Sequence, residues 1–435
     1  MPRKSRRRTL IDLSRKLIDA QRPVRVLALI AWPTGERNRF LSRKQPRLPK
    51  VRYARPRFDL RAHDATFAAI ARNCDRADPL QLILRDTAEQ YRRVLAMLEA
   101  RGTRDYTRHS RALYGTAGAP FLGGPKTNLD LANHLLSSLD GQALDRLRRQ
   151  TPRVWPAERV VRTLSQRFDR FFGRGAVRVQ ISTTLTADAA AGASRLRIRR
   201  DGEFTRQTVD YLEQHEGYVH IATSLNGSAQ PVLDILGKAS PRSVKHNEGL
   251  AVFGEWASGT LTAARLRSLA ERVQLVHLAE EGADFIDLYQ HALSLGRSPE
   301  RAYDAAHRVF RGGLPEGGAY FTKDSAYLDH FMRTFDFFRA SALHGRLDLF
   351  ELLFAGKVAI DDLPALAQAR LEGLIAPARF VPPWLASPDW LAAHLGLSSF
   401  FNQIDLSAVR AHYADLFATA PAPADEESSG AAFGG

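Results

Sequence analysis

The sequence Tyr-Leu-Glu-Gln-His-Glu-Gly-Tyr-Val-His fills positions 211–220, and His-Asn-Glu-Gly-Leu fills positions 246–250. Together they offer two histidines, a glutamate between them and a second glutamate downstream. Zinc in proteins is bound by imidazole nitrogen and carboxylate oxygen, and a catalytic site keeps three protein ligands and leaves a fourth position to water. The two stretches therefore contain the side chains of a catalytic zinc centre.

The two histidines of the first stretch, His215 and His220, lie five positions apart. Residues five apart on a regular α-helix point about 140° away from each other, so they could not share one metal ion there. A π-bulge, with its i→i+5 hydrogen bond, would return them to one side. Gly217 lies between them and would ease such a backbone adjustment. The motif alone also fits two surface or core histidines on one helix.

The flanking sequence favours a metal-binding helix. The pattern predicts a helix over residues 205–225, capped by Thr205 and stopped by Asn226-Gly227. Residues 177–181 and 196–198 alternate apolar with polar side chains, which predicts two half-buried strands upstream. We expect an α+β fold that is mostly helical and zincin-like, with a small sheet before the metal-binding helix.

The second stretch supplies candidates for the third ligand. Glu248 and Glu255 are seven residues apart and so share one face of a predicted helix. Glu248 could be the third ligand, with Glu255 as the acceptor that fixes a histidine tautomer. His246 is an alternative ligand. Glu255 could instead be a capping or solvated charge.

The chain resembles the bacterial flavohemoglobin expression-modulating QEGLA motif proteins, which are related to the eukaryotic microtubule-associated tyrosine carboxypeptidases. The blocks that carry the resemblance are separated along about residues 10–415 and comprise, besides the H-E-x-x-x-H motif, residues 22–27, 32–33, 101–103, 110–115, 225–231, 247–251, 308–313 and 317–324. One departure is visible, because Asn247 occupies the position of the glutamine in QEGLA. This change affects a neighbouring hydrogen bond and leaves Glu248 intact.

This resemblance implies one zinc ion bound by His215, His220 and Glu248, with Glu216 as general base. A zinc-bound water has a pKa of about 7, so Glu216 could take its proton and pass it to the leaving amine. The resemblance implies zinc-dependent hydrolysis that releases a C-terminal residue, with a preference for tyrosine inherited from the eukaryotic relatives.

A carboxypeptidase must also hold a terminal carboxylate, and residues 308–327 are the best source of donors. Arg311 could clamp the carboxylate, and Lys323 could bind the carboxylate or the oxyanion. Tyr320 or Tyr327 could donate a phenolic hydrogen bond. Arg311 and Lys323 could instead pair with nearby acids such as Glu316 and Asp324.

Two other candidates are weaker. The glycine-rich segment at residues 118–127 lacks the preceding apolar strand of a phosphate loop and is expected to be an ordinary loop. Cys74 is the single cysteine, which excludes an internal disulfide and a cysteine-based zinc site. It lies far from any motif that would support a nucleophile.

The net charge of +15 is concentrated at the start of the chain. Residues 1–60 hold eighteen Lys and Arg against four Asp and Glu, a surplus of fourteen. We expect a basic, partly disordered arm over residues 1–60 and a mainly helical region over residues 61–170 packed on a catalytic domain at residues 171–415. A disordered tail is expected at residues 416–435. The arm could attract an anionic partner, such as an acidic protein tail, a membrane surface or nucleic acid.

The composition, 44% hydrophobic and 25% charged, is typical of a soluble globular protein, and no run approaches the roughly 18 apolar residues of a membrane span. A cytoplasmic location is expected. The expected partner is a peptide or protein C-terminus, acidic in one version of the hypothesis, and nucleic acid is less favoured. A zinc-containing regulatory protein without catalysis is the alternative, which the retained Glu216 argues against. The oligomeric state stays open.

Overall fold

The computed structural model of the chain describes residues 3–33, 35–139, 153–185, 187–386, 388–401 and 403–414. Helices dominate these residues, and they contain one sheet of three strands. This confirms the predicted α+β class with mostly helical content, while a zincin-like fold stays a prediction. The tail predicted at residues 416–435 lies outside the described residues.

The sheet contains β1 (Arg178–Ser182), β2 (Ala189–Ala191) and β3 (Arg195–Arg199) in the order β1-β3-β2. β1 runs parallel to β3, and β2 runs antiparallel to it. Both predicted strands are confirmed, since the alternation in β3 buries Leu196 and Ile198 and leaves the intervening arginine exposed. β2 was not predicted, because three alanines carry no alternating pattern.

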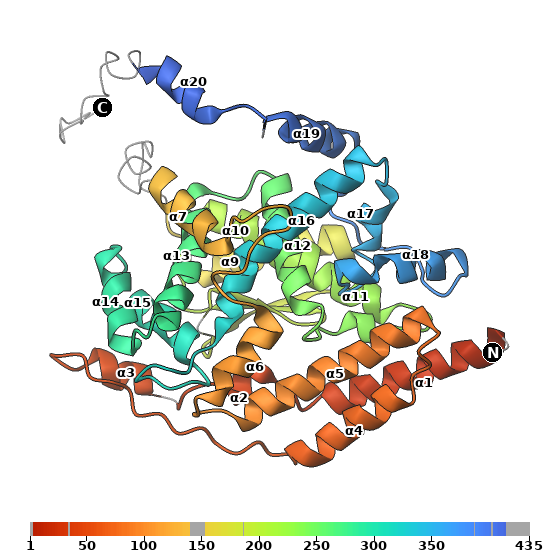
Figure 1. Ribbon diagram of the computed structural model, residues 1–435, viewed down its shortest axis with the longest axis horizontal. Helices are drawn as coiled ribbons and strands as arrows, with labels where there is room; N and C mark the ends of the chain where they lie inside the picture. Colours follow the sequence, from red (N-terminus) through yellow and green to blue (C-terminus); the bar gives the residue numbers. More distant parts are fainter. Residues whose placement is uncertain are drawn as a thin grey trace.

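Three long helices form the N-terminal side of the molecule and pack on one another: α1 (Arg3–Gln21), α4 (Leu60–Arg72) and α5 (Pro79–Glu99) (Figure 1). The sequence predicts a partly disordered arm over residues 1–60, and this is wrong for α1, which has a core-facing side of Leu10, Leu13 and Leu17. Their spacing suits one face of a helix, so burial of that face stabilises it while the basic side chains remain outside.

The N-terminal half of the chain also contains shorter helices, and further helices lie in the C-terminal half. Their bounds are α2 Val26–Leu29, α3 Glu36–Leu41, α6 Asp105–Tyr114, α7 Asn128–Ser138, α13 Ala263–Glu280, α14 Phe285–Ser294, α15 Pro299–Phe310, α17 Asp348–Leu352, α18 Leu363–Leu371, α19 Pro388–Phe401 and α20 Leu406–His412. Short 3₁₀ turns cover 234–237, 322–325, 360–362 and 383–385.

The segment that contains His215 and His220 is one continuous helical rod in three parts. It begins with α10 (Arg206–Leu212), continues as π-helix over Glu213–Ile221, and ends as α11 (Ala222–Ser228). Thr205 caps it as predicted, since its hydroxyl accepts the N–H of Thr208. The predicted π-bulge is confirmed, and it extends over nine residues. Histidines five apart therefore face the same side.

Gly217 has a different role from the one predicted. A Cβ atom at this position would lie 2.4 Å from the ring of Phe168, which belongs to α9 (Ala157–Phe172), the helix that covers the sheet. The glycine is thus required by close packing between α9 and the π-helix rather than by an unusual backbone angle, since its φ is not positive.

The predicted helix stop at Asn226-Gly227 is wrong, because the helix runs on to Ser228. Asn226 uses its amide to bind backbone groups of Phe354, Arg379 and Phe380. A Cβ at Gly227 would meet the backbone of Leu236 at 2.2 Å. These two residues therefore attach the C-terminal segment to the helix that contains His215 and His220 instead of ending it.

Two further helices complete the surroundings of the site. α12 (Val244–Ala257) packs between the π-helix and α16 (Ala326–Leu343), the long helix that crosses the middle of Figure 1. A Cβ at Gly249 of α12 would lie 2.3 Å from the carbonyl oxygen of His330, so α12 and α16 are in very close contact. Among the described residues no helix has both the length and the apolar content needed to span a membrane.

Candidate metal centre

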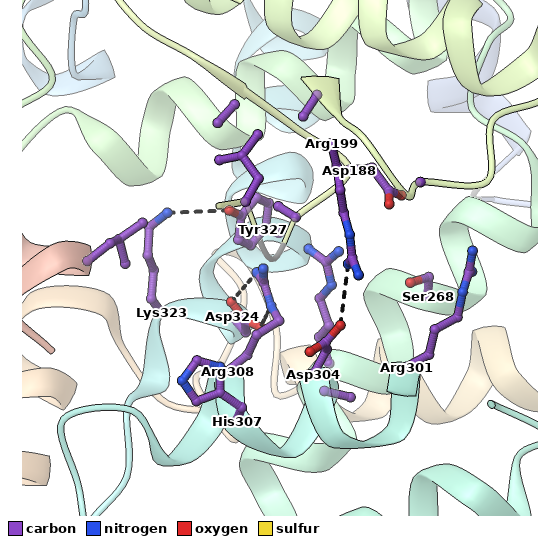
Figure 2. A pocket seen from close by; sticks show the side chains of 18 of the residues that line it. Asp188, Arg199, Ser268, Arg301, Asp304, His307, Arg308, Lys323, Asp324 and Tyr327 are labelled. Atoms are coloured by element: carbon purple, nitrogen blue, oxygen red, sulfur yellow. Dashed lines mark hydrogen bonds and ion pairs between the residues drawn. The ribbon is translucent and has the colours of Figure 1, made fainter. Parts of the chain in front are cut away.

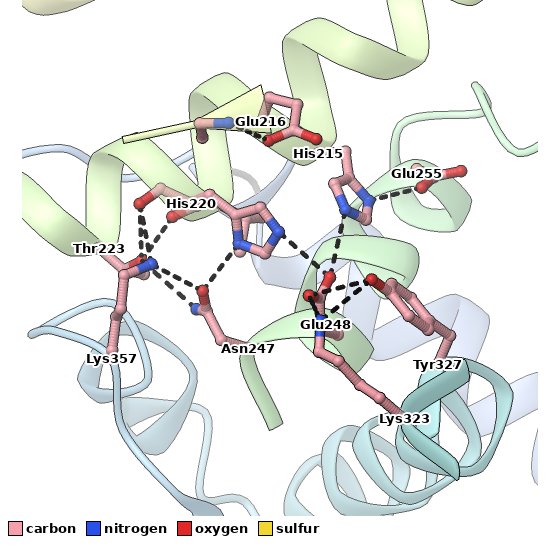
Figure 3. A network of polar contacts seen from close by, with 12 residues as sticks. His215, Glu216, His220, Thr223, Asn247, Glu248, Glu255, Lys323, Tyr327 and Lys357 are labelled. Carbon is pink, nitrogen blue, oxygen red and sulfur yellow. Dashed lines mark hydrogen bonds and ion pairs between the residues drawn. The ribbon is translucent and has the colours of Figure 1, made fainter. Parts of the chain in front are cut away.

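The side chains of His215, His220 and Glu248 converge where the π-helix faces α12 (Figure 3). One ligand atom from each lies within 4.8 Å of the others. The Nε2 atoms of His215 and His220 lie 3.5 and 3.3 Å from Oε2 of Glu248. Ligand atoms held at about 2.0–2.2 Å from a tetrahedral zinc ion are about 3.3–3.6 Å apart, so both separations fit such an ion.

His215 is oriented from behind by Glu255. Its Nδ1 lies 2.7 Å from Oε1 of Glu255, a carboxylate with no exposed surface, so the predicted hydrogen bond is present. Arg265 of α13 binds both oxygens of that carboxylate at 3.1 Å. Burial disfavours the charged form of Glu255, but Arg265 and His215 outweigh it and lower the carboxyl pKa. The arrangement leaves Nε2 of His215 as the nitrogen that faces the ligand group.

His220 is oriented by an amide. Its Nδ1 donates to Oδ1 of Asn247 at 2.8 Å, and the same oxygen accepts from Nζ of Lys357 at 2.9 Å. The amide nitrogen of Asn247 donates to the hydroxyl of Thr223 at 3.3 Å, which fixes which way the amide points. Burial lowers the pKa of the Lys357 ammonium to about 8, although the negative charges of Glu248 and Glu216 act to raise it. Asn247, which stands where the QEGLA motif has glutamine, thus orients the second histidine.

The third member, Glu248, is buried and accepts donors from α16 and the turn before it. Oε1 of Glu248 lies 2.9 Å from Nζ of Lys323 and 3.2 Å from the hydroxyl of Tyr327. Burial opposes ionisation of Glu248, but Lys323 and the two histidines hold its pKa well below the usual value. The carboxylate is therefore charged at neutral pH, as a metal ligand must be.

Glu216 lies outside the group of three. Its Oε2 accepts the backbone N–H of Ala191 in β2 at 3.0 Å, and the side chain lines the same cavity as His215 and His220. His246, the alternative ligand, lies outside the group and packs against the ring of His330 at 4.9 Å. His246 and Glu248 are two positions apart on α12, which turns their side chains to different faces.

The three residues lie in the wall of a cavity of about 910 Å³. Figure 2 shows another part of this wall, with Arg308, Lys323 and Tyr327. Arg311, Lys323 and Tyr327, three of the four residues predicted to bind substrate, line this cavity, and their substrate-binding role stays a prediction. Tyr320 is absent from its wall, because its hydroxyl accepts from Arg111 at 2.6 Å and its backbone binds Thr107. The N-terminal region contributes Leu27, Ala28, Ala31 and Arg37 to the wall.

Glu316 and Asp324 were the alternative partners expected for Arg311 and Lys323. Asp324 is instead bound by two nitrogens of Arg308, at 2.6 and 2.7 Å, and Lys323 pairs with Glu248.

The Cys74 thiol is buried, and burial raises its pKa to about 11, so it has the properties of a packed side chain. Residues 118–127 form a loop, as predicted, whose last residue caps α7.

The family of the chain follows from its similarity to known proteins. The sequence model of the microtubule-associated tyrosine carboxypeptidase family matches residues 38–403. The chain belongs to this family. The matched range includes all three residues of the candidate metal centre, Glu216 and the cavity wall from Arg265 to Tyr327. No protein with a curated description matches the chain. Membership implies an enzyme of the carboxypeptidase-like class.

Three cations near the candidate centre were not predicted from the sequence: Arg265, Arg272 and Lys357. Arg265 and Arg272 are seven residues apart on one face of α13, but no motif marks them. Lys357 stands alone, more than a hundred residues after Asn247, and only the fold brings the two together.

Proposed function

We propose that this chain is a zinc-dependent metallopeptidase that releases the C-terminal residue of a peptide or protein. The observation that carries the proposal is the convergence of His215, His220 and Glu248 at the separations of a tetrahedral site, with both histidines oriented by an outer acceptor. Family membership supports a carboxypeptidase-like substrate. The proposal includes a zincin-like fold and the QEGLA subgroup, on the blocks that resemble it.

The donor set fits zinc rather than a harder ion. Two imidazole nitrogens with one carboxylate form a ligand group typical of catalytic zinc, whereas calcium and magnesium take oxygen ligands. Each histidine would present Nε2, because Nδ1 already holds Glu255 or Asn247. A zinc ion bound there would supply a Lewis acid that acidifies water and polarises a carbonyl group.

Glu216 would act as the general base. It is adjacent in sequence to His215, lines the same cavity and is absent from the group of three. The N–H of Ala191 holds one of its oxygens, which leaves the other to accept a proton from the attacking water. Glu216 would then transfer that proton to the nitrogen of the leaving amine as the peptide bond breaks.

Lys323 and Tyr327 would stabilise the oxyanion. Both bring a donor to the same oxygen of Glu248, so both reach the edge of the candidate metal centre. Donors in such a place favour negative charge on the carbonyl oxygen of the scissile bond. Arg311 would contribute positive charge to the same cavity. Tyr320 has no role in this proposal.

The first experiment compares the native protein with Glu216→Gln and with Glu281→Gln, a matched control at an exposed glutamate. Metal content is measured by mass spectrometry of the metal, and trimming by mass spectrometry of peptides with varied C-terminal residues. We expect about one zinc per chain in all three proteins. Trimming should fall at least about 100-fold in Glu216→Gln and stay unchanged in Glu281→Gln.

Two outcomes contradict the proposal in different ways. Zinc without trimming by the native protein would favour the alternative of a non-catalytic zinc-containing regulatory protein. No zinc in any of the three proteins after reconstitution would remove the metal centre. Trimming of internal bonds instead of C-terminal residues would retain the chemistry and reject the substrate class.

A further inference from the structure

The helix α19 (Pro388–Phe401) is apolar on two opposite faces. It packs on α16, and its fully buried side chains are Leu391 and Leu395. Trp390 and Leu397 lie roughly half a turn of the helix away from that buried pair. A helix that is apolar all round is normally covered on every side. The second face of α19 is therefore built to be covered as well.

This second face has the spacing of a coiled-coil seam. Its residues Trp390, Ala393, Leu397 and Phe400 follow one another at intervals of three, four and three positions. Such an alternation places apolar residues along one side of a helix and is the pattern by which two helices pack side by side. Leu397 and Phe400 are nevertheless 56% and 58% exposed, and Ala393 is exposed as well. The described part of the chain thus leaves the seam open to solvent.

The exposed apolar surface continues from α19 into α20 (Leu406–His412), and both helices lie at the edge of the molecule (Figure 1). Among the described residues thirteen large hydrophobic side chains are exposed, and eight of them form this C-terminal apolar patch: Trp390, Leu397, Phe400, Phe401, Ile404, Leu406, Val409 and Tyr413. They are between 36% and 65% exposed. At about 200 Å² for a whole side chain, the patch presents about 800 Å², the area that one partner contributes to a standard protein interface.

The low charge of the patch narrows the choice of partner. Residues 388–413 contain two aspartates, Asp389 and Asp405, and a single cation of the Lys and Arg type, Arg410. Helices that lie on membranes are rich in Lys and Arg, and binding to nucleic acid depends on the same side chains. A nearly neutral surface does not repel a copy of itself, and a coiled-coil seam is complementary to the same seam. Closed twofold pairing is also the commonest arrangement of identical chains.

We propose that the C-terminal apolar patch is the interface of a homodimer, in which the exposed seam of α19 packs against the same seam of a second copy of this chain. Pairing would remove the patch from water on both copies and would cover the second face of α19. The inference does not depend on the candidate metal centre. Among the described residues, those that line the cavity include none from positions 388–413, so the interface is separate from the cavity.

Sedimentation velocity of the full-length protein at about 1 to 100 µM tests the proposal. We expect the native protein to form a dimer within this range. Leu397→Glu and Phe400→Glu, which put a charge into the seam, should each raise the dissociation constant at least about 30-fold. Leu122→Glu is the matched control, because Leu122 is 86% exposed and lies outside the patch, and it should leave the dimer unchanged. Circular dichroism checks that each variant keeps its helices.

A cross-linking experiment keeps the test independent of the charged variants. Cys74 is the single cysteine and is buried, so an introduced cysteine provides the accessible thiol. Under mild oxidation Leu397→Cys should form a disulfide between two copies, because Leu397 lies in the middle of the seam, whereas Leu122→Cys should not. A native protein that stays monomeric up to about 100 µM would overturn the proposal, as would a dimer that survives both glutamate substitutions. A monomer that floats with vesicles of neutral phosphatidylcholine would overturn it too and assign the patch to a membrane surface.

Discussion

Oδ1 of Asn247 accepts two hydrogen bonds, from Nδ1 of His220 at 2.8 Å and from the buried ammonium of Lys357 at 2.9 Å. The opposite histidine has the same arrangement, with Glu255 as acceptor and Arg265 as cation. Each histidine of the candidate centre is thus oriented by an oxygen that a buried cation holds in place. The two differ in charge, since one acceptor is a carboxylate and the other a neutral amide.

The first prediction concerns Asn247. Replacing it with Leu removes the acceptor that orients His220, and we expect zinc affinity to fall about 10- to 100-fold, the usual effect of losing such a partner. Lys357→Met should weaken affinity in the same direction by freeing the amide to rotate. Competition with a chromophoric chelator measures both. Lys126→Met, at an exposed lysine, is the control, and equal affinity in all four proteins would contradict the role of Asn247.

The second prediction concerns the buried pair of Glu255 and Arg265. Glu255→Leu leaves the Arg265 guanidinium buried without its anion, which costs about 3–5 kcal/mol of unfolding free energy. The melting temperature of the zinc-free protein should therefore fall, because this cost does not depend on metal. Scanning calorimetry of the zinc-free proteins measures it. The double variant Glu255→Leu, Arg265→Leu should recover much of the loss, and its failure to do so would argue against an electrostatic cause.

The third prediction compares two arginines near Asp324. Arg308→Gln removes the direct partner of buried Asp324 and should lower stability near the low end of about 3–5 kcal/mol, because Arg272 and Arg311 remain close. Arg272→Gln removes a half-buried charge that attracts Asp324 without a direct ion pair, so stability should stay within about 1 kcal/mol or rise. Urea denaturation of both variants measures the two changes in unfolding free energy. A larger loss in Arg272→Gln than in Arg308→Gln would contradict the charge assignment.

The fourth prediction concerns pH. Burial, with repulsion from Arg311 and Arg308, lowers the pKa of His307 to about 3. The unfolded chain gains a proton at this residue as pH falls below about 6.5, whereas the folded chain stays neutral until about 3. The unfolded state binds more protons in this window, so the contribution of neutral His307 to stability is fully present above about pH 6.5. This contribution declines as pH falls, by on the order of 4 kcal/mol across the window.

Urea midpoints at pH 7.5 and pH 5 measure this effect. His307→Gln should reduce the loss of stability between the two values, while His344→Gln, at an exposed histidine, should not. An unchanged loss in His307→Gln would show that other groups carry the acid sensitivity.

Patterns within single segments of the sequence were sufficient to predict the secondary-structure elements of the site. The five-residue spacing of His215 and His220, taken with the hypothesis of a shared metal ion, predicted a π-bulge, and the structure has a π-helix of nine residues there. The seven-residue spacing of Glu248 and Glu255 predicted their common face, and the alternation in residues 196–198 predicted a strand. The stop at Asn226-Gly227 failed, since their tertiary role is invisible locally: an amide that binds distant backbone and a missing Cβ that admits Leu236.

What the sequence by itself determined is therefore the inventory and the spacing of the chemical groups along single helices. The tertiary structure decided which distant side chains meet them: Lys357 on Asn247, Arg265 on Glu255, and Arg272 beside Tyr327. The reason is physical. Backbone periodicity fixes direction within one element, whereas contacts between elements depend on how several helices pack, and packing is set by the whole core.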